Sequence, residues 1–531
     1  MTHGSRVYTN ILILIAILFM LLLLIDRYYW AQISQWREDQ ATNLWLGFTS
    51  VISNLPVGLI SSRKIPNPNG MPLLGIFLSA LPNLLSISFF LGTLQMILIA
   101  LLGWKAFGRK WQYLLLATMP ALASVALRSS SVEFWNQYTI TLLNIFFLFW
   151  VVRYLENASL WNLPPIAILI LLAPALYLAG IVNAIVMTLI TIGVLFYKRP
   201  DRDGFWLVSV IILLLVLSSA LLTWLPYFRS VGLEQIIRDI QIKPAQAGTV
   251  PWAFKHADPR ILSATSRTLL AIADGIYFLQ IAFTFLAFLY LFWSTVFSKR
   301  SLETYADTSP RYIAILCGIF ILLSHAISAL LGGEDWFGNQ RPDQTVQFLP
   351  LSLMFIFLLP FSVSRSKREE RPINAASTLL VGAFVLANLL CGFSIIRDHL
   401  FYRGDILTEA DIPLIDKEHV VDFIAKDWQV DSTSKVIPVD YDLGGGKWDW
   451  VPEFGEKLEK WYPALMTMGR SFDYELLRRY GLTNAQEGIQ LRTFGEGRYL
   501  VTYSFEKPPK VEDEQITHHV FGRLRVSVVE K

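Results

Sequence analysis

The sequence predicts an all-α polytopic membrane domain of about eleven transmembrane helices, followed by a small α/β domain outside the membrane. Hydrophobic residues make up 54% of the 531-residue chain and charged residues only 16%, whereas charged residues are about a quarter of a soluble domain. Apolar runs recur along residues 1–396, and residues 397–531 alternate short helical and strand patterns instead. Too few charges are left to coat a globule of this size, so much of the surface must face lipid.

The predicted spans are apolar runs that meet or nearly meet the ~20 residues needed to cross the hydrocarbon layer. The first run has one arginine nearby and no small-residue cleavage site after it, which favours an uncleaved span over a signal peptide. The runs centre on residues 11–25, 86–104, 112–127, 139–153, 163–179, 181–197, 205–225, 276–297, 312–331, 345–363 and 374–396.

Lysine and arginine collect in alternate connections, which predicts the orientation of the chain. With a cytoplasmic N-terminus, the inner connections carry clusters such as that at 105–110, whereas the short outer connections 128–138 and 332–344 hold only Arg128 and Arg341. Eleven crossings then place the C-terminal domain outside the cell. We therefore expect a multi-pass protein of the plasma (inner) membrane.

Three polar segments fall on the outer side, namely 26–85, 226–275 and the tail 397–531. In the tail, "HVVDFIAKDW" and "SFDYELLRRYGL" are helical patterns, and "KVIPVDY", "GRYLVTYSFE" and "RLRVSVVEK" are strand patterns. The cytoplasmic loops are short, so nothing folded is expected inside. The function is therefore expected on the outer face.

The first outer segment begins with "WREDQATNLW", which holds an acidic pair, Glu38 and Asp39. If this stretch is helical, Leu44 and Phe48 start an apolar stripe that Val51 and Leu55 continue. Asp39 then points about 140° away from the stripe, and Glu38 diverges from Asp39 by about 100°. Only one carboxylate can serve a site, and we choose Asp39. The alternative is a solvated helix start with acidic residues favoured by the helix dipole.

A proline-rich stretch, "RKIPNPNGMP", follows the acidic pair. Its prolines at 66, 68 and 72 favour an extended, rigid loop, and Asn69-Gly70 favours a turn. The stretch also carries Arg63, Lys64 and Asn67. A carboxylate, cations and amides therefore converge on one outer loop at the level of the lipid headgroups.

This layout resembles the C-type membrane glycosyltransferases, which include the protein O-mannosyltransferases and the lipid A aminoarabinose transferases. The resemblance rests on an uncleaved first span, the acidic pair at 38–39 and the "PNPNG" loop before the second span. It implies transfer of a sugar from a polyprenyl-phosphate carrier to a glycan, lipid or protein acceptor on the outer face. It also implies an acidic residue, Asp39 or its rival Glu38, that acts as base or positions the acceptor.

Transfer from a lipid phosphate needs a base for the acceptor proton and cations for the leaving phosphate. A single displacement inverts the anomeric carbon. Arg128 ends the third run, and lipid snorkelling is its equally weighted alternative. The candidate substrate- and phosphate-binding residues are Arg63, Lys64, Asn67, Asn69, Arg128, Glu133, Arg229, Lys255, Arg260 and Arg341.

No cofactor is required by this interpretation, and no nucleic-acid partner is expected because the charges are segregated rather than gathered in a patch. His256 and Asp258 could hold a divalent metal, but two ligands one residue apart are weak support for a site. His325 is favoured as a packing residue in its span. Cys317 and Cys391 lie in apolar runs and are expected to be buried thiols rather than a disulfide.

Other functional classes remain open from the sequence. A transporter or flippase usually carries polar groups near the middle of the bilayer, whereas the central spans here are nearly free of charge. A polysaccharide polymerase or ligase acting on lipid-linked glycans is a closer alternative. A non-catalytic assembly subunit whose tail binds a partner is the third.

Overall fold

The computed structural model describes the larger part of the chain, and the structural findings concern that part. It covers residues 3–34, 36, 38–48, 57–60, 66–106, 117–122, 124–134, 136–177, 180–199, 203–232, 261–273, 275–276, 289, 310–332, 375–401, 412–443, 470–484, 498–505 and 515–530.

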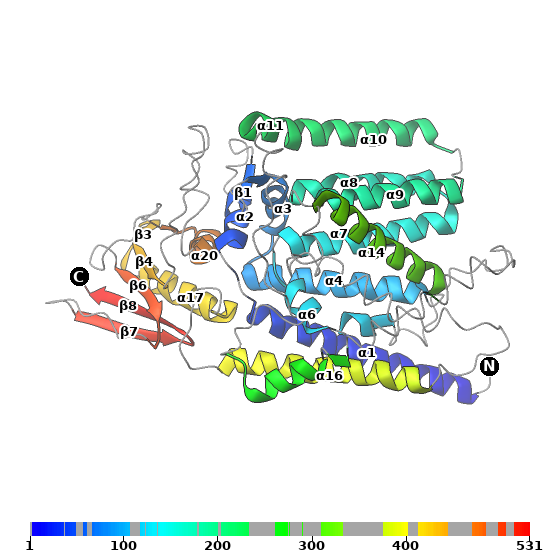
Figure 1. Ribbon diagram of the computed structural model, residues 1–531. Helices are drawn as coiled ribbons and strands as arrows, with labels where there is room; N and C mark the ends of the chain where they lie inside the picture. The colour runs from blue at the N-terminus through cyan, green and yellow to red at the C-terminus, as the bar shows by residue number, and fades with distance from the viewer. Residues whose placement is uncertain are drawn as a thin grey trace.

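Long apolar helices dominate residues 1–401 and lie roughly parallel to one another (Figure 1). Within the described ranges, five are long and apolar enough to cross a membrane: Ile13–Gln32, Leu84–Ala106, Tyr138–Asn157, Phe205–Arg229 and Gly382–Phe401. Shorter apolar helices occupy Leu160–Leu176, Ile181–Tyr197 and Ile313–Ser324. The chain is therefore a multi-pass membrane protein. The predicted runs 276–297 and 345–363 lie almost entirely outside the described residues.

The helices of this region match most of the predicted runs. They are α1 (His3–Gln32), α2 (Glu38–Phe48), α3 (Gly70–Leu78), α4 (Leu84–Ala106), α6 (Val125–Ser131), α7 (Asn136–Asn157), α8 (Leu163–Leu176), α9 (Ile181–Tyr197), α10 (Phe205–Ser219), α11 (Leu225–Val231), α14 (Pro310–Gly332) and α16 (Ala375–Phe401). The 3-10 turns η3 (Met119–Ala121) and η4 (Leu160–Asn162), and a π-helical turn η6 (Ala220–Trp224), join some of them.

The predicted span at 112–127 is wrong in its described part. Residues 117–121 form a helical turn and η3, and a separate helix, α6, begins at Val125. Pro120 has no N–H to donate to a continuing helix. Ser124 then caps the new helix by accepting a hydrogen bond from the Leu127 N–H at 3.3 Å.

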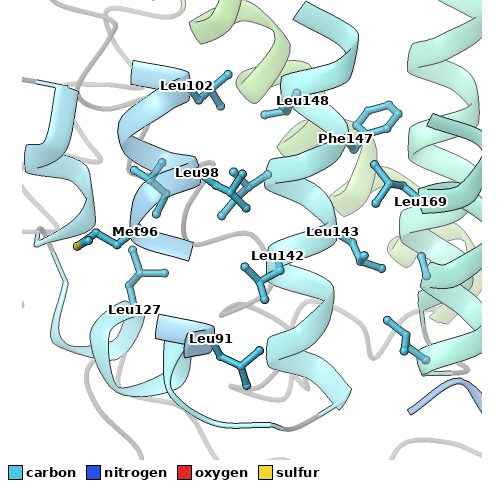
Figure 2. Close-up of a cluster of buried hydrophobic side chains, with 14 of the residues drawn as sticks. Leu91, Met96, Leu98, Leu102, Leu127, Leu142, Leu143, Phe147, Leu148 and Leu169 are labelled. Carbon is cyan, nitrogen blue, oxygen red and sulfur yellow. The ribbon is translucent and has the colours of Figure 1, made fainter. Parts of the chain in front are cut away.

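Interlocking aliphatic side chains hold the bundle together. Figure 2 shows one cluster, in which α4, α6, α7 and α8 meet through Leu91, Met96, Leu98, Leu102, Leu127, Leu142, Leu143, Phe147, Leu148 and Leu169. Cys317 and Cys391 are both buried and free, which confirms the expectation of buried thiols. Only 6% of the most apolar 18-residue stretch of the Phe205–Arg229 helix is buried, as expected for a helix that faces lipid.

The C-terminal part of the chain is a small α/β domain, as the tail patterns predict. Helices α17 (Leu414–Asp431) and α20 (Arg470–Tyr480) pack on a four-stranded sheet of order β4-β6-β8-β7. Strand β4 pairs parallel with β6, and β8 pairs antiparallel with both β6 and β7. The strands are β3 (Val436–Ile437), β4 (Val439–Asp442), β5 (Thr483–Asn484), β6 (Tyr499–Tyr503), β7 (Gln515–Phe521) and β8 (Leu524–Glu530). Strand β7 is not among the predicted strands, and its residues 517–520 are exposed.

The α/β domain docks on the end of the bundle that carries α2 and α3, opposite the N-terminus (Figure 1). Two carboxylates of the domain cap the first turn of α4. Glu475 Oε1 accepts the Leu84 N–H at 2.6 Å, and Glu418 Oε1 accepts the Leu85 N–H at 3.1 Å. These bonds satisfy donors that a helix N-terminus otherwise leaves unpaired. The domain is therefore joined to the membrane helices by specific polar contacts.

Burial strongly perturbs the Glu475 carboxyl. Desolvation, assisted by the nearby charge of Glu418, raises the pKa of Glu475 to about 8, although the Leu84 N–H and Arg479 oppose the shift. Burial raises the pKa of Glu418 as well. The folded protein therefore holds the Glu475 proton more tightly than the unfolded chain, in which a glutamate titrates near its ordinary value of 4.5.

We expect stability to fall as the pH rises through about 8, because a raised folded-state pKa favours folding only while the group is protonated. The Glu475→Gln variant keeps an oxygen for the Leu84 N–H but cannot ionise. Its apparent thermal midpoint should therefore vary less than that of the wild type between pH 5 and pH 9. Asp442→Asn, at an exposed carboxyl, is the control. An equal pH dependence in wild type and Glu475→Gln contradicts the assignment.

Candidate functional site

The acidic pair opens helix α2, and Trp36, two residues before the pair, is fixed on three sides. Its indole N–H donates to Ser88 Oγ at 2.7 Å. Its ring stacks on Phe134, with centroids 6.4 Å apart. Its backbone oxygen accepts a hydrogen bond from Lys417 Nζ at 2.6 Å. Trp36 is fully buried, so the chain enters α2 from a rigid point.

The residue after the pair is also tied down. Gln40 Nε2 donates to Glu133 Oε2 at 3.5 Å, and both side chains are buried. Glu133 precedes Phe134, the ring on which Trp36 stacks. The structure thus brings the predicted site residue Glu133 to the first turn of α2, where Glu38 and Asp39 stand.

Helix α2 is packed tightly along its length. Glycines allow its close approach to α3, because a Cβ at Gly47 would lie 2.6 Å from the Pro72 oxygen and one at Gly75 would lie 2.8 Å from the Asn43 oxygen. Thr42 and Asn43, three and four residues after Asp39, are buried. Val51 and Leu55, predicted to extend the helix, lie outside the described residues.

The proline-rich loop is extended and then turns, as predicted. Strands β1 (Val57–Ile60) and β2 (Pro66–Pro68) pair antiparallel, and Asn69 forms the turn before α3. Helix α3 itself was not expected: Pro72 lies in its first turn, where a missing N–H costs little, rather than in an extended segment.

The side chain of Asn69 connects this loop to the π-helical turn η6, which directly follows α10. Asn69 Nδ2 donates to the Leu222 oxygen in the π-helical turn η6 at 3.4 Å. The side chain is buried, and its Oδ1 has no hydrogen-bond partner among the described residues. Arg229 is exposed on α11, a helix that lies against β1. The amide and the cation thus border the same loop.

Arg128, a predicted phosphate ligand, lies in a fully buried charge cluster. Arg128 Nη2 is 2.9 Å from Asp26 Oδ1, and Arg27 Nη1 is 2.8 Å from Asp26 Oδ2. Arg128 also donates to the Asn388 oxygen at 2.8 Å, and its guanidinium lies 5.5 Å from the centre of the Trp30 ring. None of the three charged side chains is exposed, so Arg128 does not snorkel to the headgroups.

Several sequence-predicted residues have no structural account. Arg63, Lys64, Lys255, Arg260 and Arg341 lie outside the described residues, as do the side chains of Glu38, Asp39, Asn67 and His325. The possible metal ligands His256 and Asp258 also lie outside. Within the described part of the chain, no group of three or more His, Cys, Asp or Glu side chains could hold a metal ion.

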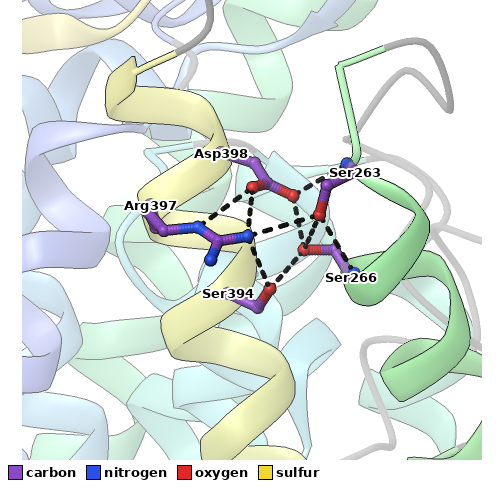
Figure 3. Close-up of polar contacts among 5 residues, drawn as sticks. All are labelled: Ser263, Ser266, Ser394, Arg397 and Asp398. Carbon is purple, nitrogen blue, oxygen red and sulfur yellow. Dashed lines mark hydrogen bonds and ion pairs between the residues drawn. The ribbon is translucent and has the colours of Figure 1, made fainter.

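A second polar cluster joins the helix at 264–273 to the end of α16 (Figure 3). Asp398 Oδ2 accepts the Ser263 N–H at 2.8 Å and also the Ser266 hydroxyl. Arg397 Nη2 pairs with Asp398 Oδ1 at 2.9 Å. Asp398 therefore caps the helix at 264–273, and the cluster is explained by helix capping.

The partners of the candidate residues are not predicted from the sequence. Asp26 and Arg27 stand inside α1, which continues to Gln32, seven residues past the predicted run. Adjacent ionisable residues at the end of an apolar run are a signal that could have identified them. Lys417 carried no such signal, because it is one of several charges on an otherwise ordinary helix.

The fold and the site together define a class: a multi-pass helical membrane protein whose C-terminal α/β domain docks at the buried polar start of α2. No protein-family model matches the chain, and no curated protein sequence matches it. Among solved structures, the chain is similar to the crystal structure of ArnT from Cupriavidus metallidurans in the apo state, with 12% identity, a TM-score of 0.44 and coverage of 99% of this chain and 98% of that one. It is also similar to the same protein bound to undecaprenyl phosphate, with 12% identity, a TM-score of 0.39 and the same coverage.

Proposed function

We propose that this protein is a membrane glycosyltransferase that moves a sugar from a polyprenyl-phosphate carrier to an acceptor on the outer face, with inversion at the anomeric carbon. Asp39 is the base that takes the acceptor proton, and Glu38 is the alternative. The sugar-donor class follows from the resemblance of residues 36–72 to the C-type membrane glycosyltransferases.

The observation that carries the proposal is that residues on both sides of the acidic pair are held in place. Trp36 is held by Ser88, Phe134 and Lys417, and Gln40 is held by Glu133. A general base must be held within hydrogen-bond reach of the proton it removes. A fixed helix start at the docking end of the bundle supplies such a position.

Cations are required for the second half of the reaction, because negative charge grows on the leaving phosphate. In the buried cluster, the two guanidinium groups of Arg27 and Arg128 face the single carboxylate of Asp26. The two guanidinium groups outweigh the one carboxylate, and this net positive charge favours an anion nearby. The proposed contacts to the phosphate itself are Arg63, Lys64, Asn67, Asn69, Lys255, Arg260 and Arg341. Arg128 contributes its positive charge from inside the bundle, without touching the phosphate.

The proposal includes a membrane topology. About eleven spans, a cytoplasmic N-terminus and an extracytoplasmic α/β domain follow from the distribution of lysine and arginine. The protein would then lie in the plasma (inner) membrane with α2, α3 and the α/β domain outside. The position of the N-terminus at the opposite end of the bundle supports this arrangement (Figure 1).

The test is a donor assay with the purified full-length protein in lipid nanodiscs. We expect release of labelled sugar from a polyprenyl-monophosphate donor, with transfer to a glycan or lipid acceptor extract. Consumption of pyrophosphate-linked oligosaccharide alone would indicate a polymerase or ligase. Movement of an intact lipid-linked sugar across the bilayer, without bond cleavage, would indicate a flippase. Either result overturns the proposed function.

A further inference from the structure

Lys417 is a buried charge at the junction between the two parts of the protein. It lies near the start of α17 and is 2% exposed. Its Nζ donates to the Trp36 backbone oxygen at 2.6 Å and to Ser471 Oγ at 3.3 Å, and it lies 5.6 Å from the centre of the Phe472 ring.

A buried ammonium group is costly unless oxygen atoms replace its water. Ser471 and Phe472 belong to α20 of its own domain, whereas Trp36 belongs to the segment that enters α2. Hydrogen bonds from a charged group are roughly twice as strong as neutral ones. The bond to Trp36 is therefore a strong and directional link between the α/β domain and the chain entering α2.

The other contacts of Trp36 show what this bond fixes in place. Trp36 cannot turn away, because Ser88 and Phe134 hold its side chain while Lys417 holds its backbone oxygen. Glu38 follows two residues later and Asp39 three residues later. A shift at Trp36 must therefore move the first turn of α2.

We propose that Lys417 is a positioning residue for the glycosyl transfer, an inference that rests on the proposed function. It couples docking of the α/β domain to the placement of the acidic pair. The domain thus completes the reaction centre from outside, without itself contributing a reacting group.

Lys417→Met tests the proposal, because methionine keeps the apolar stem and removes the charge and donor. Misplacement of a reacting group by about 1 Å can cost roughly 100-fold in rate. We expect kcat to fall by about 10- to 100-fold, with the KM for the lipid donor changed by less than about 2-fold. Lys417→Arg retains a charged donor and is expected to recover part of the lost kcat.

Two variants separate positioning from general loss of docking. Lys426→Met removes an exposed lysine of the same helix. Arg478→Met removes another docking contact, the 2.7 Å bond from Arg478 Nε to the Ser79 oxygen, which does not touch Trp36. Both should retain kcat better than Lys417→Met. Equal losses in Arg478→Met and Lys417→Met, or an unchanged kcat in Lys417→Met, overturn the positioning role.

Hydrogen exchange of the full-length protein supplies a readout that needs no activity. We expect Lys417→Met to speed exchange in residues 36–43 while strands β6 and β8 stay protected. If that variant does not accumulate, the wild type is informative: peptides 36–43 and 414–421 should open together, and independent opening overturns the coupling. A wild type without transferase activity overturns the proposed function, whereas the exchange data still report on the contact between Lys417 and Trp36.

Discussion

Asp39→Asn is expected to lower the turnover of the lipid-linked donor by about 10²- to 10⁴-fold, the usual contribution of general-base catalysis. Asparagine preserves the size and most hydrogen bonds of aspartate but cannot accept the acceptor's proton. Trp36 and Gln40 hold the backbone on both sides, so the substitution should leave α2 in place. Single-turnover measurements with excess enzyme should show the loss in the chemical step rather than in donor binding.

The control for this experiment is the rival carboxylate. Glu38→Gln is expected to reduce turnover much less, because a regular helix directs the two side chains about 100° apart. A large loss in Glu38→Gln with normal turnover in Asp39→Asn transfers the role to Glu38. If both variants keep normal turnover, the general base does not lie on α2.

Asp26→Asn is expected to destabilise the protein by about 3–5 kcal/mol, the cost of leaving a buried charge without its partner. Arg27 and Arg128 both pair with this one carboxylate, and none of the three side chains is exposed. Neutral asparagine leaves two guanidinium groups facing each other inside the bundle. The measurement is the apparent midpoint of thermal unfolding in detergent, together with the yield of folded protein.

A double-mutant cycle distinguishes this pairing from a general effect of the substitution. Arg128→Gln combined with Asp26→Asn should be less destabilising than the sum of the two single changes, because the second change removes a charge that the first left unpaired. Asp203→Asn, at an exposed carboxylate, should have little effect. Additive losses in the cycle contradict a direct interaction between Asp26 and Arg128.

Local patterns in the sequence predicted the elements well. Apolar length placed α4, α7, α9 and α16, because a helix that crosses lipid must be apolar over its whole length. Periodicity placed α17, whose buried residues recur at helical spacing, and a valine-rich run placed β8. The π-helical turn η6 was missed because it does not change the hydrophobicity of its run. The short helix α6 was missed because it starts inside the run at 112–127 and ends in the polar residues 128–131.

Only those parts of the candidate site that are formed by residues close in sequence could be predicted. The acidic pair and the Asn69 turn are visible as motifs because their residues are neighbours in the chain. The contacts that fix them are not: Gln40 meets Glu133 across 93 positions, and Lys417 meets Trp36 across 381. No spacing rule connects residues so far apart, and only the packed structure brings them together.

The caps on α4 carry a consequence for biogenesis. Leu84 meets the carboxylate of Glu475 across 391 positions of the chain. At synthesis rates of about 5–20 residues per second, the helix waits roughly 20–80 s for that partner to be made. During this interval water or lipid headgroups must satisfy the start of the helix, so this end of the bundle matures only after Glu475 has been made.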